Sequence, residues 1–190
     1  MPRVIPSNVV RGRKNPLHFG FAERLKRARR VADVSYAALG RQAGFGSRTT
    51  AALLENGERV PRVDTVEKLA SALDVSPAWL AFGLDFPANN GPVSTRTNLA
   101  ARLCEARTAH RLSLREVGRR AGSSGSQVQQ TEQGRTIPTL STVEQLARAL
   151  GISPAWLAFG LGPMTLPNPH RTKSGHREES SVQPSSSSPE

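Results

Sequence analysis

The sequence contains the nine-residue stretch SPAWLAFGL at positions 76–84, and the same nine letters return at positions 153–161. When the comparison starts at Thr65, 16 of 20 aligned residues are identical at an offset of 77. Farther upstream the offset is 78, so the first copy carries one extra residue between Gly44 and Glu55. A repeat of this length indicates two copies of one structural unit in the 190-residue chain.

Apolar spacing predicts that each copy folds into short helices. Four apolar residues of the second copy fall at positions i, i+3, i+4 and i+7 and share one helix face: Val143, Leu146, Ala147 and Leu150. The first copy repeats this stripe, and neither copy shows the alternation typical of a strand. In the second copy we expect five helices, near residues 96–109, 113–121, 124–133, 139–150 and 153–160.

Start and stop signals agree with these helices. Ser35 and Ser113 directly precede helical patterns and are good N-cap residues. Ser153 is followed by a proline, which is favoured at the first helical position. Gly57 and Gly134 follow the third helix of each copy, where a left-handed cap is expected.

These patterns divide the chain into five parts. They are a basic flexible arm (1–20), a first domain (21–86), a linker (87–95), a second domain (96–162) and a disordered Pro/Ser-rich tail (163–190). The arm contains four basic residues and no acidic one, so it is either an untidy terminus or a segment that contacts a DNA minor groove or phosphates.

Composition restricts the class of partner. The net charge is +11 and the pI is about 11.4, which indicates a polyanionic partner such as double-stranded DNA. The sequence has no apolar run of transmembrane length and no signal-peptide pattern. We therefore expect a cytoplasmic, nucleoid-associated protein with no membrane partner.

Composition also argues against catalysis and metal binding. The single cysteine, Cys104, excludes an intrachain disulfide and a thiolate metal cluster, and the four histidines show no ligand spacing. We find no cysteine–histidine pairing and no phosphate-cradling glycine loop. The sequence therefore predicts a protein that is not an enzyme and holds no metal or cofactor, with Cys104 as a buried or half-buried residue of the first helix.

The second and third helices of the second copy carry the functional signal. Residues 113–121 and 124–132 are joined by a tight turn at Gly122, and Val128 is the core-facing residue of the latter segment. The exposed positions of this segment are polar: Ser126, Gln127, Gln129 and Gln130. A glutamine amide can pair with adenine in the major groove of DNA.

The combined pattern resembles the lambda-repressor-like, or Xre-like, helix-turn-helix family. The resemblance covers about residues 20–84 and 96–162 and rests on these residues of the second copy: Leu103, Arg107, Ser113, Val117, Ala121, Gly122, Glu132, Gly134, Pro138, Leu146, Ala147 and Leu150. It implies an all-α fold of two tandem five-helix DNA-binding domains with disordered termini. It also implies that the third helix docks in the major groove and that the start of the second contacts phosphate. Members are commonly repressors of bacteria and phages.

The resemblance places the candidate DNA-binding residues. In the second copy they are Ser113, Ser124, Ser126, Gln127, Gln129, Gln130 and Arg135. In the first copy they are Arg48, Thr49 and Thr50. Ala52 and Leu53 stand where the second copy has glutamines, so we expect the second copy to be the main reader. The family often has a glutamine after the second-helix cap, and this chain has Tyr36 and Leu114 there.

Several alternatives stay open from the sequence. Trp79 and Trp156 are expected to pack in the core, but the resemblance also links the fifth helix to dimerisation, either between the copies of one chain or in a homodimer. The basic run at 24–30 is either a solvated face or a phosphate contact. The main hypothesis is a sequence-specific transcriptional repressor. The alternative is a protein-interaction adaptor, for example an antitoxin-like protein, which uses degenerate domains to hold a protein partner.

Overall fold

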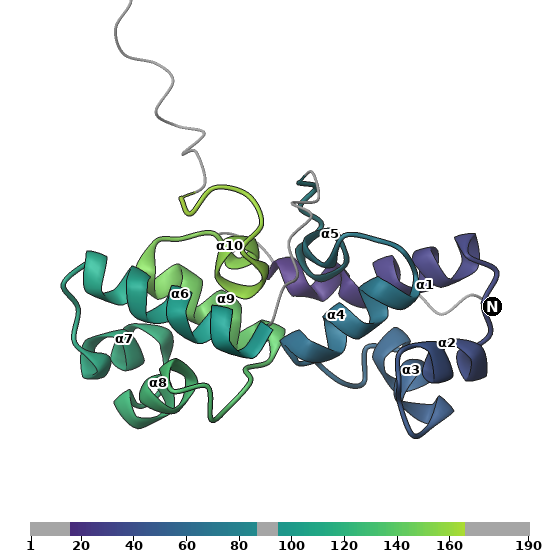
Figure 1. The fold of residues 1–190 in the computed structure, drawn as a ribbon, viewed down its shortest axis with the longest axis horizontal. Helices are drawn as coiled ribbons and strands as arrows, with labels where there is room; N and C mark the ends of the chain where they lie inside the picture. Colours follow the sequence, from purple (N-terminus) through teal and green to yellow (C-terminus); the bar gives the residue numbers. More distant parts are fainter. Residues whose placement is uncertain (1–15, 87–94, 166–190) are drawn as a thin grey trace, which may run out of the picture.

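The computed structural model describes residues 16–86 and 95–165, and every regular element within these ranges is a helix (Figure 1). The first copy contains a 3-10 helix and five α-helices: η1 (Leu17–Gly20), α1 (Phe21–Val31), α2 (Tyr36–Gln42), α3 (Arg48–Glu55), α4 (Val63–Ala72) and α5 (Pro77–Phe82). The second copy contains five α-helices: α6 (Thr95–Ala109), α7 (Leu114–Ala121), α8 (Gly125–Glu132), α9 (Leu140–Leu150) and α10 (Pro154–Phe159). The predicted all-α fold is confirmed.

The predicted helix caps are present. The Ser113 hydroxyl accepts a hydrogen bond from the Glu116 N–H at 3.1 Å, and the Ser153 hydroxyl accepts one from the Trp156 N–H at 3.4 Å. Gly134 follows α8 with φ at +67°, a left-handed conformation that glycine adopts without a steric penalty. Local sequence signals therefore set the helix ends in this chain.

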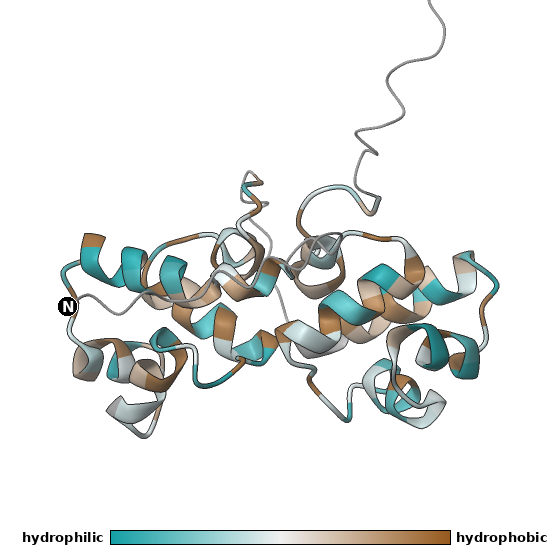
Figure 2. Cartoon of the chain, turned by 180° about the vertical axis from the view of Figure 1, so that it is seen from behind, coloured by the Kyte–Doolittle hydropathy of each residue, from teal (hydrophilic) through white to brown (hydrophobic). Residues whose placement is uncertain are grey.

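Apolar side chains from all the α-helices form the core. Leu25 of α1, Leu69 of α4 and Leu103 of α6 are fully buried. Trp79 and Trp156 pack against this core half-buried. Figure 2 shows hydrophobic and hydrophilic stretches along the same helices, as expected for short amphipathic helices around a small core.

Two arginines close the ends of the fifth helices. The Arg24 guanidinium of α1 donates to the carbonyls of Leu80 at 2.9 Å and Ala81 at 2.7 Å. Arg102 of α6 makes the equivalent two bonds to the last turn of α10, at 3.0 and 2.7 Å. The final carbonyls of a helix have no partner inside it, so these arginines satisfy groups that would otherwise be buried without one.

A second arginine of each copy joins the first helix to the third. Arg29 donates to both carboxylate oxygens of Glu55, at 2.8 and 2.9 Å, and Arg107 does the same with Glu132, at 2.7 and 3.0 Å. Such bidentate pairs fix orientation as well as distance. From the sequence, the basic run of α1 is expected to be either a solvated face or a phosphate contact. For Arg24 and Arg29 both alternatives are wrong, because their donors bind carbonyls and a carboxylate inside the domain.

The two copies contact each other through equivalent residues, which lie 77 positions apart. Arg62 and Thr139 form an isolated antiparallel bridge. Beside it the Val63 N–H donates to the Pro138 carbonyl at 3.1 Å, and the reciprocal bond, from α9 to the first copy, measures 3.0 Å. Reciprocal contacts between equivalent residues are the mark of two-fold symmetry.

The fifth helices meet at the same interface. α5 and α10 contact each other, and the rings of Phe82 and Phe159, which are also equivalent, have centroids 6.1 Å apart (Figure 1). We call this interface, made of residues 61–63, residues 138–140, Phe82 and Phe159, the seam. The fifth-helix contact therefore lies within one chain and relates the two copies by an approximate two-fold axis.

The folded part of the first copy begins before residue 21. Residues 17–20, which the sequence analysis assigned to the arm, form η1 and contact α1, α5 and α9. The His18 N–H donates to Glu144 Oε1 at 2.7 Å, and His18 Nδ1 lies 3.0 Å from Glu144 Oε2. η1 therefore bridges the first copy to the second.

The second copy continues past the expected boundary at residue 162. The Ser153 N–H donates to the Met164 carbonyl at 2.6 Å, and Met164 packs against the core. The remaining expectations for the arm, the linker and the tail fall on residues 1–15, 87–94 and 166–190 and lie outside the described part of the chain.

Glu67 of α4 is the counterpart of Glu144 and lies beside the seam. Burial raises the pKa of this carboxyl to about 7, although Arg102 lowers it and Asp64 adds to the rise. Its Oε1 atom is buried and has no hydrogen-bond partner among the described residues. Between its unfolded and folded pKa values, the folded chain keeps a proton that the unfolded chain releases.

This environment predicts a pH-dependent effect of Glu67→Gln on stability. The favourable contribution of the protonated carboxyl is complete below its unfolded pKa and is lost as the pH rises through about 7. Relative to the wild type, Glu67→Gln should therefore gain stability progressively between about pH 5 and pH 8. Urea unfolding across this range measures the difference, with Glu23→Gln, at an exposed residue of α1, as the control. A difference that is constant with pH would contradict the prediction.

Candidate nucleic-acid interface

The turn between α7 and α8 depends on close backbone packing. Gly122 adopts φ at +67° and reverses the chain after α7. A Cβ atom on Gly118 would lie 2.6 Å from the backbone carbon of Ser124, so only glycine permits this approach of α7 to the start of α8. The two helices are thereby held as one rigid unit.

One face of α8 is polar and exposed, as the sequence analysis predicted. Val128 is the apolar residue that points into the core, with 1% of its surface exposed. The other face presents the expected residues to solvent: Ser126, Gln127, Gln129 and Gln130. Ser113, Ser124 and Arg135 are also exposed, at the starts of α7 and α8 and after the end of α8. The structure therefore brings all seven second-copy candidates to the outer surface of this unit.

Gln127 has a second role, which the sequence analysis missed. Its Oε1 atom accepts hydrogen bonds from the Ser123 hydroxyl at 2.6 Å and from the Ser124 N–H at 3.3 Å. In return the Ser124 hydroxyl accepts the Gln127 N–H at 3.2 Å. This is a capping box, and the spacing Ser-x-x-Gln was the signal that could have revealed it. Because the side-chain carbonyl of Gln127 already accepts two hydrogen bonds, the group that remains free in this conformation is the NH2 donor of Gln127.

A hollow lies where the starts of α7 and α8 meet. It is lined by Ser113, Arg115, Glu116, Arg119, Ser123, Ser124 and Gly125. Gly125 lets the two backbones approach, because a Cβ there would lie 3.1 Å from the Arg115 Cα. Exposed N–H groups at two helix starts, together with Arg115, favour an anion such as a phosphate. Arg115 and Arg119 were not among the candidates from sequence.

The charges around this hollow are partly paired. Hydrogen bonds from Arg119 and then Arg120 lower the pKa of Glu116 to about 2. Both guanidinium groups lie 2.7 Å from the same carboxylate oxygen. Two cations on one anion leave net positive charge at the surface, and Arg115 adds to it.

The first copy shows a different surface on its third helix. Ala51 and Leu54 of α3 are buried, Ala52 and Leu53 are half-buried, and Thr49 is exposed. These residues leave little polar surface beside Thr49. The predicted candidates Thr50 and Arg48 also lie on α3, where Thr50 is half-buried and the side chain of Arg48 lies outside the described part.

The extra residue of the first copy, which the repeat places between Gly44 and Glu55, lies in the turn before α3. Gly44 adopts φ at +67°, and Ser47 caps α3 by accepting the Thr49 N–H at 3.1 Å. Two residues, Phe45 and Gly46, separate Gly44 from this cap, whereas the second copy has a single serine there. The two turns therefore differ in length by one residue.

The departures from the family glutamine have structural roles. The Tyr36 hydroxyl donates to Glu55 Oε1 at 3.0 Å, and its ring lies 4.3 Å beneath the Arg29 guanidinium carbon. Leu114 is half-buried and packs against the core. Neither residue offers an exposed amide at the start of its helix, so any contact at that position must come from the backbone or from neighbours such as Arg115.

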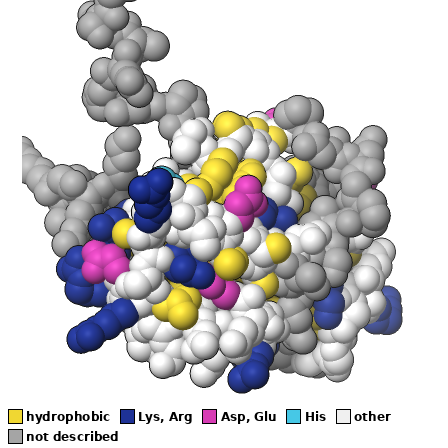
Figure 3. Space-filling model, turned by 60° about the vertical axis from the view of Figure 1, so that its left-hand side comes forward, with side chains coloured by type: hydrophobic (Ala, Val, Ile, Leu, Met, Phe, Trp, Pro, Cys, Tyr) yellow, Lys and Arg dark blue, Asp and Glu magenta, His cyan; other side chains and the backbone are white. Residues whose placement is uncertain are grey.

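Both helix-turn-helix units lie on one side of the molecule. In Figure 1, α2 and α3 occupy one end of its lower edge, and α7 and α8 occupy the other. The approximate two-fold axis of the seam relates them. Figure 3 views the end formed by the second copy, where Lys and Arg side chains surround its lower part.

Two short helices joined by a tight turn, the second with an exposed polar face, define a helix-turn-helix DNA-binding protein. The sequence profile of the family described as helix-turn-helix domain matches residues 21–81 and 98–158. The chain belongs to this family, and its general role is that of a DNA-binding regulator. No solved structure matches the chain. Within the described residues no helix combines the length and apolar character needed to cross a membrane.

The capping box predicts that α8 depends on Ser124. Replacing it with alanine removes the acceptor for the Gln127 N–H, so Ser124→Ala should lower the free energy of unfolding by about 1 kcal/mol. Ser126→Ala, at an exposed position of the same helix, should change it by less than about 0.5 kcal/mol. Thermal or urea unfolding of the full chain measures both. Equal effects of the two substitutions would show that the cap does not stabilise α8.

Proposed function

We propose that the protein is a sequence-specific transcriptional repressor that reads the major groove with α8. The observation that carries this proposal is the exposed polar face of α8 beside a basic hollow. Ser126, Gln129 and Gln130 supply donors and acceptors for base edges, and Gln127 supplies its NH2 donor. A donor alone suits an acceptor such as a purine N7. Gln127 is therefore proposed to read one acceptor and not to pair bidentately with adenine.

Phosphate contacts orient such a helix. We assign this role to Ser113 and Arg115 in the hollow at the start of α7, with Ser124 nearby. Arg135 follows the opposite end of α8 and contacts the DNA phosphate backbone on that side. These contacts carry no base specificity, but they fix the register in which the glutamines meet the bases.

The first copy has a supporting role in this proposal. Thr49 and Thr50, with Arg48 at the start of α3, contact DNA weakly, because Ala52 and Leu53 replace the two glutamines of α8. Since the seam holds both units in one chain, a single molecule covers two half-sites about one helical turn apart. The approximate two-fold axis makes these half-sites an inverted repeat. Repression follows from occupation of such a site on a bacterial or phage genome.

The recovered binding site should show this asymmetry. Selection from a random pool of double-stranded DNA should yield an inverted repeat with one well-defined half-site and one degenerate half-site. Binding should fall steeply with salt, because phosphate contacts release counterions. Recovery of no enriched sequence would rule out a specific regulator, and two equally defined half-sites would contradict the supporting role of the first copy.

Paired substitutions test the division of labour between the copies. The double variant Gln127→Ala with Gln130→Ala should weaken specific binding by at least tenfold, since a lost base contact costs about 1–3 kcal/mol. The matched pair Thr49→Ala with Thr50→Ala should weaken it much less. Titration of the selected DNA site with each purified variant measures the dissociation constants. Equal losses in the two variants would refute α8 as the main reader.

One observation favours the adaptor as a second candidate. Phe19 and Val60 of the first copy are 65% and 43% exposed, and they border a hollow whose lining includes Phe21, Leu54 and Pro61. An exposed apolar surface of this kind suits a protein partner. A stoichiometric complex with another protein, together with no DNA binding above that of random sequence, would favour the adaptor.

A further inference from the structure

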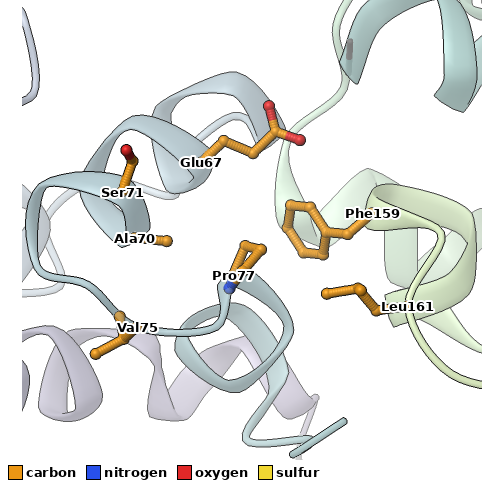
Figure 4. Close-up of a pocket in the computed structure, with 7 residues that line it drawn as sticks. All are labelled: Glu67, Ala70, Ser71, Val75, Pro77, Phe159 and Leu161. Atoms are coloured by element: carbon orange, nitrogen blue, oxygen red, sulfur yellow. The ribbon is translucent and has the colours of Figure 1, made fainter. Parts of the chain in front are cut away.

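A pocket of about 400 Å³ lies at the seam, between the two copies (Figure 4). The first copy lines it with residues of α4, of the turn that follows α4 and of the start of α5, and the second copy lines it with the last residue of α10 and with Leu161 beyond it. They are Glu67, Ala70, Ser71, Val75, Pro77, Phe159 and Leu161. A molecule bound there would touch both copies at once.

Glu67 is the one acidic side chain of this pocket. Figure 4 shows its carboxylate extending across the upper side of the pocket toward the second copy, above the ring of Phe159. Burial disfavours its charged form, and within the described residues its Oε1 atom accepts no hydrogen bond. Arg102 is near, but its guanidinium donates to the carbonyls of Leu157 and Ala158. The pocket thus combines apolar walls with a buried acceptor.

The approximate two-fold symmetry shows what such a glutamate can bind. Glu144 occupies the equivalent position on α9, and there the N–H and the imidazole of His18 approach its two oxygens at 2.7 and 3.0 Å. The chain's own segment η1 supplies this nitrogen-bearing partner. Within one molecule, the same position therefore already accepts a hydrogen bond from a backbone N–H of a segment inserted at the seam, with an imidazole nitrogen beside it.

Smaller side chains shape the pocket on the first-copy side. Ser71 stands where the second copy has Arg148, and Val75 stands where it has Ile152. Both residues line the pocket and are smaller than their counterparts in the second copy. These two positions therefore distinguish the surroundings of Glu67 from those of Glu144.

We propose that the seam pocket binds a small molecule with a compact apolar body and a cationic nitrogen group, which donates a hydrogen bond to Glu67. Phe159, Leu161 and Pro77 receive the apolar body. A cationic donor suits a desolvated carboxylate because their charge-assisted hydrogen bond replaces the lost water. Since the ligand touches α4, α5 and α10, it holds the two copies in one arrangement and thereby the two helix-turn-helix units. The site goes beyond the proposed repressor function and does not depend on it.

Benzylamine is a suitable probe, because it joins one aromatic ring to one primary amine. Isothermal titration of the full chain without DNA should show binding of benzylamine. Benzyl alcohol, which has the same ring but no cationic nitrogen, should bind at least tenfold more weakly. Because DNA is absent, the result is independent of whether the protein is a repressor.

Three variants locate the binding. Glu67→Gln removes the anionic acceptor, and Ser71→Arg places the second-copy side chain at the pocket, so each should weaken benzylamine binding at least tenfold. Ser71 is exposed, and an arginine is already accommodated at the equivalent position of α9. The substitution should therefore leave the fold intact. The matched control Arg148→Ser should bind as the wild type does. The proposal would be overturned if the wild type does not bind benzylamine, or if Glu67→Gln or Ser71→Arg binds it as tightly as the wild type does.

Discussion

The contact between the two fifth helices, α5 and α10, is the interaction on which the arrangement of the two copies depends. Each helix has six residues, which make less than two turns, and its last carbonyls find no partner inside the helix. Arg24 and Arg102 supply donors to these carbonyls, and Phe82 and Phe159 cover each other across the copies. Both copies have the same sequence in the fifth helix, and they contact each other through equivalent residues of it. Such a contact relates the two copies by a two-fold axis.

That relation decides where the two helix-turn-helix units lie, so the seam and the reading surface are separate parts of the structure. The apolar core is shared by both copies, each copy keeps its own arginine–glutamate pair, and changes on an exposed helix face leave the seam intact. The two copies differ in sequence at such exposed or half-buried positions. The second copy has Gln129, Gln130 and Arg148 where the first has Ala52, Leu53 and Ser71. Substitutions there cost little stability, so one unit can keep a polar reading surface while the other changes.

Much of the scaffold was predictable because its signals are local. Ser113 and Gly134 mark helix ends through bonds to residues within one turn, and Val128 identified the inner face of α8, which left its outer face for the site. The partners of Arg24 and Arg29 were missed because they lie 56 and 26 residues away along the chain. The local bonds of Gln127 were within reach of sequence reasoning, since Ser-x-x-Gln is a known capping pattern.

By itself the sequence determined that the chain is helical, that it repeats one unit, where the helices end and which face of α8 is polar. Each of these properties depends on residues that are neighbours on one helix or turn, or on direct comparison of the two copies. Only the tertiary structure decided that the copies meet within one chain, that His18 bridges to Glu144 and that Glu67 lines a pocket at the seam. The physical reason is that periodicity identifies an apolar face but not the surface that covers it.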